Sequence, residues 1–275
     1  MSSSARAFAP GNISCVFKVY EHKNPRWMGS YGFGFTLDEG VTAEASIAKK
    51  NDVIFNKKAI NFPTVLSLIR KLTNKKIRIS LTSKLPLGCG FGLSGASALA
   101  SAYSINKLLN LMNSRKYLAV MAHTAEVENR TGLGDVVNQY YGGFCIKAKP
   151  SSHFVVKKFP IKNVEVYCRH FGKISTKSII NNPKLREKIN AAASTALNSL
   201  RTDYKMNFSQ IIKISKGFAV NSGLLKDKRT AQTISQIDKN NGNASMIMLG
   251  NAVFSDTPFK KSIKLKITNK GAHLL

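Results

Sequence analysis

The chain has 275 residues, of which 43% are hydrophobic and 20% charged, which excludes an intrinsically disordered protein and predicts one compact unit with two lobes. Its formal charge is +28, but the Lys residues are spread along the whole chain, so we attribute the charge to composition rather than to a polyanion-binding surface. No stretch approaches the roughly 18 apolar residues of a membrane helix, so we expect a cytoplasmic protein without membrane contact. The four cysteines form no CxxC pair, so we expect neither disulfides nor a zinc site.

The first half of the chain alternates strands with helices. Hydrophobic spacing predicts strands at 12–20, 41–47, 52–56, 77–83 and 140–148, and helices at 63–72, 94–112 and 115–130. Ser114 is the expected N-cap of the last helix.

A change of composition at residues 149–152 marks the expected boundary between two lobes, 1–150 and 151–275. The second lobe has expected strands at 153–159, 163–170, 242–254 and 261–267, with a helical stretch at 174–238. Helices and strands are mixed in both lobes, which predicts the α+β class.

A glycine-rich loop between a strand and an Ala-rich helix is the most informative segment. Residues 86–99 read PLGCGFGLSGASAL, with four glycines within eight residues. Because glycine has no Cβ, such a loop can approach a ligand closely, and its amides together with the helix N-terminus can bind phosphate oxygens. The alternative is a turn that only joins strand to helix.

Two common phosphate-binding patterns do not fit this loop. Gly90, Gly92 and Gly95 satisfy GxGxxG, but a dinucleotide site requires an acidic residue about 20 positions downstream. No Asp or Glu occurs from Phe91 to Ala125, and the pattern GxxxxGK[ST] is absent. The sequence therefore predicts a phosphate loop of a third kind.

Carboxylates are scarce, yet Glu126, Glu128 and Asp135 lie within ten residues of one another. On a helix, His123, Glu126 and Arg130 would share one face, and Glu128 would point elsewhere. A surface salt bridge is the alternative role for Glu126, and an N-cap is the alternative for Asp135.

Phosphoryl transfer needs a phosphate loop, a metal ion and a group that accepts the hydroxyl proton. We assign Mg²⁺ to Ser94 and Glu126, and the proton to Asp135 as the catalytic residue. The phosphates of ATP are assigned to the loop residues Pro86, Gly88, Cys89, Gly90, Phe91, Gly92, Leu93, Ser94, Gly95 and Ala96.

These segments resemble the GHMP kinases, named for galactokinase, homoserine kinase, mevalonate kinase and phosphomevalonate kinase. Ala9–Asn12 is similar to the family's N-terminal PGK element, residues 86–98 to its P-x-x-x-GLGSSA loop, and residues 242–250 to its C-terminal glycine motif. Asn12 replaces the usual Lys, and the C-terminal segment lacks the glycine run. The resemblance implies an N-terminal lobe with a left-handed βαβ unit and a ferredoxin-like C-terminal lobe.

Residues 29–34 and 123–135 (HTAEVENRTGLGD) resemble the archaeal pantoate kinase branch in particular. That resemblance implies transfer of a phosphoryl group from ATP to the 4-hydroxyl of pantoate, on the archaeal route to coenzyme A, and a possible homodimer. It also implies a substrate site at Ser30, His123, Arg130 and Lys147. A buried core histidine, a solvated lysine and a turn serine are the alternatives for His123, Lys147 and Ser30.

Two other functions stay open at this point. A GHMP kinase for mevalonate or homoserine would have the same phosphate loop, so the loop does not separate these acceptors. A basic nucleic-acid-binding protein fits the net charge, but no basic stripe with stacking aromatics supports it, and Trp27 is the only tryptophan.

Overall fold

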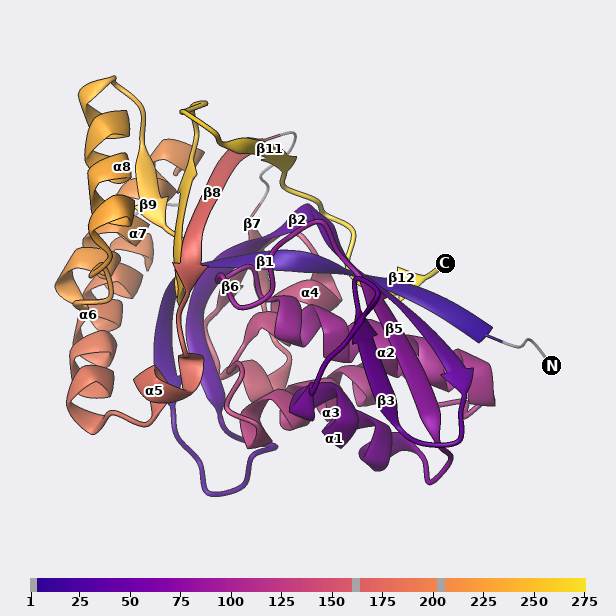
Figure 1. Ribbon diagram of the computed structural model, residues 1–275. Helices are drawn as coiled ribbons and strands as arrows, with labels where there is room; N and C mark the ends of the chain where they lie inside the picture. The colour runs from indigo at the N-terminus through magenta and orange to yellow at the C-terminus, as the bar shows by residue number, and fades with distance from the viewer. Residues whose placement is uncertain (1–3, 160–163, 202–205) are drawn as a thin grey trace.

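A long hairpin of β1 (Ser4–Tyr20) and β2 (Gly29–Ile47) is the centre of the computed structural model (Figure 1), which describes residues 4–159, 164–201 and 206–275. The sheet around it has the order β12-β1-β2-β5-β3-β4, with β6 paired to β2 and β7 paired to β6. Its other strands are β3 (Asp52–Phe55), β4 (Lys58–Ala59), β5 (Ile77–Thr82), β6 (Phe144–Lys147), β7 (Lys157–Phe159) and β12 (His273–Leu274). The strands pair antiparallel except β3 and β5, which are parallel and are joined through α1 (Pro63–Leu72).

Four helices lie together beneath this sheet in Figure 1: α1, α2 (Leu93–Leu109), α3 (Arg115–Glu128) and α4 (Asp135–Tyr141). Helix α2 is the central one, and it contacts β1 and β2 as well as the other three helices. Most of its residues are buried, and its many Ala and Ser side chains allow this close approach on all sides. Its N-terminus, which follows the glycine loop, is therefore rigidly placed.

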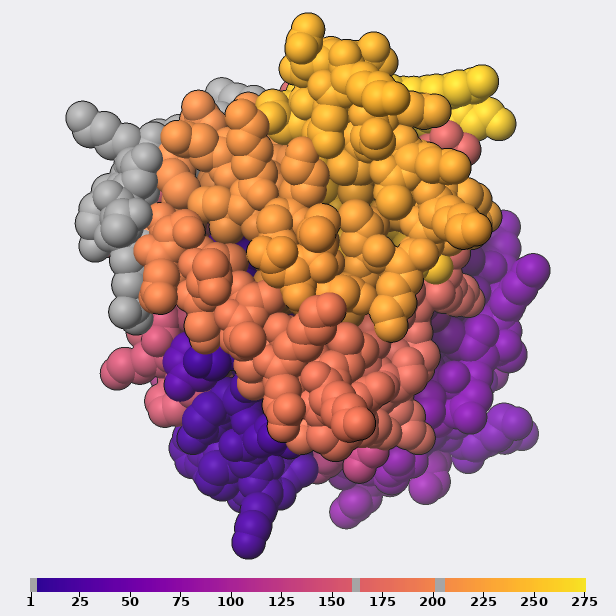
Figure 2. Space-filling model, turned by 90° about the vertical axis from the view of Figure 1, so that its left-hand side faces the viewer, coloured from indigo at the N-terminus to yellow at the C-terminus, as the bar shows by residue number. Residues whose placement is uncertain are grey.

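The second half of the chain forms an antiparallel sheet of order β11-β8-β10-β9. Its strands are β8 (Glu165–Lys173), β9 (Ala244–Met246), β10 (Gly250–Ser255) and β11 (Ile263–Lys266), and its helices are α5 (Thr176–Ile180), α6 (Pro183–Arg201), α7 (Phe208–Asn221) and α8 (Lys228–Lys239). Figure 2 shows these helices, in orange, covering one side of the molecule.

The two halves share contacts along β1. Helices α6 and α7 pack against this strand, and Asn190 accepts a hydrogen bond from Val19 N at 2.8 Å. Strand β12 returns to pair with β1. The short 3-10 helix η1 (Ser151–His153) docks on the first half, where Ser151 Oγ accepts from Ser30 N at 2.9 Å. The expected division after residue 150 stays a prediction.

The structure confirms the α+β class and most of the expected elements, with several differences. Tyr140 and Tyr141 of the expected strand 140–148 end α4, and the expected strand 242–254 is divided into β9 and β10. The predicted helix 115–130 ends at Glu128, and Arg130 has a φ of 56°, so its placement on one helical face with His123 is wrong. The glycine-rich residues 29–34 form part of β2, and 153–159 is a strand only from Lys157. In the part of the chain that the structure describes, no helix combines the length and the apolar character needed to cross a membrane.

Candidate active site

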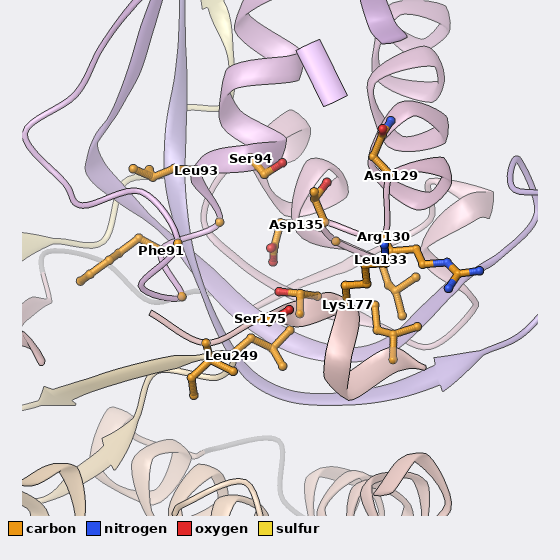
Figure 3. Close-up of a pocket in the computed structure, with 18 of the residues that line it drawn as sticks. Phe91, Leu93, Ser94, Asn129, Arg130, Leu133, Asp135, Ser175, Lys177 and Leu249 are labelled. Carbon is orange, nitrogen blue, oxygen red and sulfur yellow. The ribbon is translucent and has the colours of Figure 1, made fainter. Parts of the chain in front are cut away.

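A cavity of about 440 Å³ opens between the two halves of the chain. Its walls combine the glycine loop, the turn from Asn129 to Asp135, the start of α5, and the segment before β10 (Figure 3). The predicted phosphate loop and the predicted proton acceptor, which are about 40 residues apart in sequence, therefore face the same space.

The glycine loop follows the predicted conformation. Gly88, Gly90 and Gly92 have φ values of 83°, 90° and 64°, in the region that favours glycine, and Gly92 is the last residue before α2. A Cβ on Gly90 would lie 2.9 Å from Met248 O, so the loop also packs tightly on the segment where a C-terminal glycine motif was expected. The amides at the start of α2 thus border the cavity, as a phosphate site requires.

Six of the ten predicted loop residues line the cavity: Gly88, Gly90, Phe91, Gly92, Leu93 and Ser94. The other four, Pro86, Cys89, Gly95 and Ala96, are not part of its wall. Cys89 is buried, and burial raises the pKa of its thiol. All four cysteines of the chain are free and buried.

Glu126 is fully buried at the end of α3, and its Oε2 has no hydrogen-bond partner among the described residues. Two glycines make room for this carboxyl group, because a Cβ on Gly95 or Gly132 would lie 2.9 Å or 2.6 Å from Oε2. Burial, with a smaller contribution from the charge of Asp135, raises the pKa of Glu126 to about 8, while the nearby Ser94 and Thr131 hydroxyls oppose the rise. An unpaired buried carboxyl group beside a hydroxyl suits a hard cation.

Asp135 is the first residue of α4, and its carboxylate is held by two donors. Its Oδ1 accepts from Asn12 Nδ2 at 2.7 Å and from Ser14 Oγ at 3.1 Å. Burial raises the pKa of Asp135, while the positive charge of Lys147 and the two donors oppose the rise. The expected alternative, an N-cap, does not apply, since the N-cap is Gly134.

The four predicted substrate residues divide into two pairs. Ser30 and Arg130 line the cavity, and the Arg130 guanidinium donates to Asn181 Oδ1 at 2.7 Å. His123 and Lys147 are buried and do not belong to the cavity wall. Lys147 Nζ donates to Gly134 O at 3.3 Å, directly behind the turn that carries Asp135.

His123 is a buried residue whose ring is neutral. Its Nε2 donates to Met28 O at 2.9 Å, and its ring packs edge-on against Phe154. Burial lowers the pKa of His123 to about 4, and the charge of Lys147 adds to the effect. These contacts match the alternative of a core histidine.

Sequence reasoning did not identify several residues of the cavity wall. They are Ser14 and Phe17 of β1, Ile60, Asn61 and Phe62 before α1, Leu87 of the glycine loop, Asn129 after α3, Ile174, Ser175, Thr176, Lys177 and Ile180 around the start of α5, and Met248 and Leu249. Ser14 could have been found, because it lies two positions after Asn12 and so on the same face of an expected strand. The residues near α5 have no marker in the sequence.

Comparisons with known proteins identify the family of the chain. Residues 57–143 match the family described as GHMP kinases N terminal domain. The chain is 35% identical over 252 residues to "Pantoate kinase" of Methanocaldococcus jannaschii, covering 90% of each protein. It is 31% identical to "Pantoate kinase" of Methanospirillum hungatei, covering 98% of this chain and 96% of the relative. A solved structure described as "Phosphotransferase related to CoA biosynthesis pathway" has the same fold, with a TM-score of 0.85 at 23% identity over 98% of both chains.

The fold, the cavity and these relatives define the class: the chain belongs to the GHMP kinases, which are ATP-dependent small-molecule kinases. Within that class its family is that of the pantoate kinases, since both relatives are more than 30% identical and are covered almost completely.

Proposed function

We propose that the protein transfers the γ-phosphoryl group of ATP to the 4-hydroxyl of pantoate, giving 4-phosphopantoate and ADP on the route to coenzyme A. The hydroxyl oxygen bonds to the γ-phosphorus, the bond from that phosphorus to the β,γ-bridging oxygen breaks, and Asp135 takes the hydroxyl proton. One observation carries the proposal: the glycine loop at the start of α2 and the Asp135 carboxylate line one cavity.

The residues also suit a magnesium ion. Ser94 and Glu126 would hold it, because the Ser94 hydroxyl lines the cavity and Glu126 Oε2 has no protein partner in the described residues. When bound, the ion would neutralise the charge of the transferring phosphates. Among the described residues, no group of three or more His, Cys, Asp or Glu side chains gathers, which fits an ion that arrives with ATP rather than a resident metal.

Pantoate has a carboxylate and two hydroxyl groups, so its site needs cations and hydrogen-bonding groups. Ser30 and Arg130 lie on the wall of the cavity and are proposed to contact it directly. Lys147 lies behind the Gly134 carbonyl, from where its charge favours both an anionic substrate and an ionised Asp135. His123 is proposed to support this wall through Met28.

A coupled assay of ADP release with pantoate, mevalonate and homoserine tests the proposed acceptor. We expect the highest kcat/KM with pantoate. A clear preference for mevalonate or homoserine would instead make the chain a GHMP kinase for that alcohol.

Glu126→Gln and Ser94→Ala should raise the Mg²⁺ concentration needed for half-maximal activity. An unchanged Mg²⁺ dependence in both variants would remove these residues from the proposed metal site.

A further inference from the structure

Asn12 is a fully buried residue of β1 that hydrogen-bonds to both chemical parts of the site. Its backbone N donates to Phe91 O of the glycine loop at 2.9 Å. Its side-chain Nδ2 donates to Asp135 Oδ1 at 2.7 Å. The residue therefore joins the phosphate loop to the proton acceptor through a rigid strand.

The direction of the Asn12 amide depends on Asn138, which lies one turn after Asp135 on α4. Asn138 Nδ2 donates to Asn12 Oδ1 at 2.9 Å, and both side chains are fully buried. A rotated Asn12 amide would place its oxygen against the Asp135 carboxylate, so that two acceptors would face each other. Asn138 opposes that rotation because it occupies the Asn12 oxygen with a donor.

Two further features support a dedicated arrangement. Gln139, the next residue of α4, donates from Nε2 to Gly92 O at 2.8 Å, which gives the helix a second bond to the glycine loop. A Cβ on Gly34 would lie 2.4 Å from Ile13 O and 3.2 Å from Asn138 Nδ2, so this glycine lets β2 pack closely on β1 and on the Asn138 amide. Helix α4 is thus joined to the loop directly through Gln139 and indirectly through Asn138 and Asn12.

We infer that Asn138 is a positioning residue for phosphoryl transfer, which acts by holding the Asn12 amide as a donor to Asp135. Neither amide is part of the cavity wall, so neither is expected to touch ATP or the acceptor. The pair aligns the carboxylate with the γ-phosphate position set by the glycine loop. This inference rests on the proposed function, because it takes Asp135 to be the group that accepts the proton.

A double-mutant cycle on the full chain tests the inference, with pantoate, ATP and Mg²⁺ as substrates. Asn138→Ala should lower kcat roughly tenfold or more, the loss expected for a disturbed hydrogen bond to a charged group, while both KM values change less than about twofold. Asn12→Ala should have a similar effect. The double variant should be no worse than Asn12→Ala alone, because Asn138 acts through Asn12.

Asn190→Ala is the matched control. Like Asn138, Asn190 is an asparagine whose side-chain amide makes hydrogen bonds inside the protein. It makes two partly buried ones to the backbone of Val19, but it lies on α6 and is not part of the cavity wall. It should lower thermal stability and leave kcat unchanged. If Asn138→Ala does not fold, Asn138→Leu keeps a similar side-chain shape but has no donor for Asn12 Oδ1, and it should also lose kcat.

A kcat within twofold of wild type in the folded Asn138 variant would overturn the inference, as would losses that multiply in the double variant. Failure of the proposed function has a different signature. If wild type phosphorylates another alcohol instead of pantoate, the same cycle is measured with that alcohol, and the expected and contradicting results stay the same.

Discussion

At the scale of single residues, the site depends on two buried carboxyl groups with different surroundings. Burial raises the pKa of Asp135, but its two hydrogen-bond donors and the charge of Lys147 oppose that rise and stabilise the ionised form. Glu126 has an unpaired oxygen and a pKa raised by burial, so its ionised form needs a nearby positive charge, which a cation would supply. This difference supports the proposal that the first accepts the proton and the second holds the metal ion.

Asp135→Asn should lower kcat by about 10²–10⁴-fold, because an amide has the size of the carboxylate but does not accept the proton. Binding of ATP should change little, since the glycine loop is unaltered. Steady-state kinetics together with calorimetric titration of a non-hydrolysable ATP analogue measure the two effects separately. Normal turnover in the variant would exclude Asp135 from the mechanism.

His123 makes the stability of the fold depend on pH in a defined direction. Its pKa is lowered from 6.5 to about 4 in the folded protein, so the unfolded chain binds the proton first as the pH falls. The contribution of His123 is fully present above pH 6.5 and is lost as the pH falls towards 4. Denaturant unfolding of wild type and His123→Gln at pH 7, 5.5 and 4.5 should show wild type losing up to about 3 kcal/mol relative to the variant. Parallel pH dependences would contradict a neutral, buried His123.

At the scale of elements, the turn from Asn129 to Asp135 and the glycine loop enclose Glu126. The turn needs glycine where it passes the carboxyl group, because a Cβ on Gly132 would lie 2.6–2.8 Å from three carboxyl atoms of Glu126. This steric requirement links the local sequence of the turn to the proposed metal site.

Gly132→Ala should displace Glu126 and therefore raise the Mg²⁺ concentration for half-maximal activity at least several-fold, with a loss of stability of about 1–3 kcal/mol. Gly217→Ala is the control, because Gly217 lies within α7 and an added Cβ meets none of the described residues within 4 Å. It should stabilise the protein by about 0.5–1 kcal/mol without changing activity. Equal Mg²⁺ dependence in the two variants would contradict the account of the turn.

The elements that sequence reasoning predicted well are those with strong local signals. Helix α1 has the predicted bounds, since Pro63 suits a first turn and Val65, Leu68 and Ile69 form one buried face. Ser114 caps α3 as expected, accepting from Tyr117 N. The glycine part of β2 was missed, because Gly32 has a φ of 137° and packs on Val16 O, a long-range contact that local sequence does not show.

The candidate site was predictable to the extent that its residues are rare in this sequence. The glycine cluster and the three carboxylates stand out by composition, and the structure brings Asp135 and the loop to one cavity. Thr176 and Lys177 reach that cavity only because β8 places the start of α5 against it. Their position depends on tertiary packing, so spacing along the chain did not reveal them.

At the scale of the whole molecule, the two sheets are coupled through β1 and the C-terminal residues. Ser215 Oγ of α7 donates to Cys15 O at 3.0 Å, and Arg115 donates to Ala272 O at 2.9 Å. Strand β1 therefore packs with elements from both halves of the sequence. The expected homodimer and cytoplasmic location stay predictions.

Because of this coupling, we expect the chain to unfold in one cooperative transition. Fluorescence of Trp27, which follows β1 in the first half, should change with the same guanidinium midpoint as far-UV circular dichroism, which reports all helices. Two separated midpoints would mean that the halves unfold independently.

A crystal structure with a non-hydrolysable ATP analogue, Mg²⁺ and pantoate tests the central claim most directly. The account predicts the analogue's phosphates along Gly88–Ser94, the ion at Ser94 and Glu126, and the 4-hydroxyl of pantoate between the γ-phosphate and Asp135. A nucleotide bound elsewhere, or a γ-phosphate on the far side of the cavity from Asp135, would contradict it.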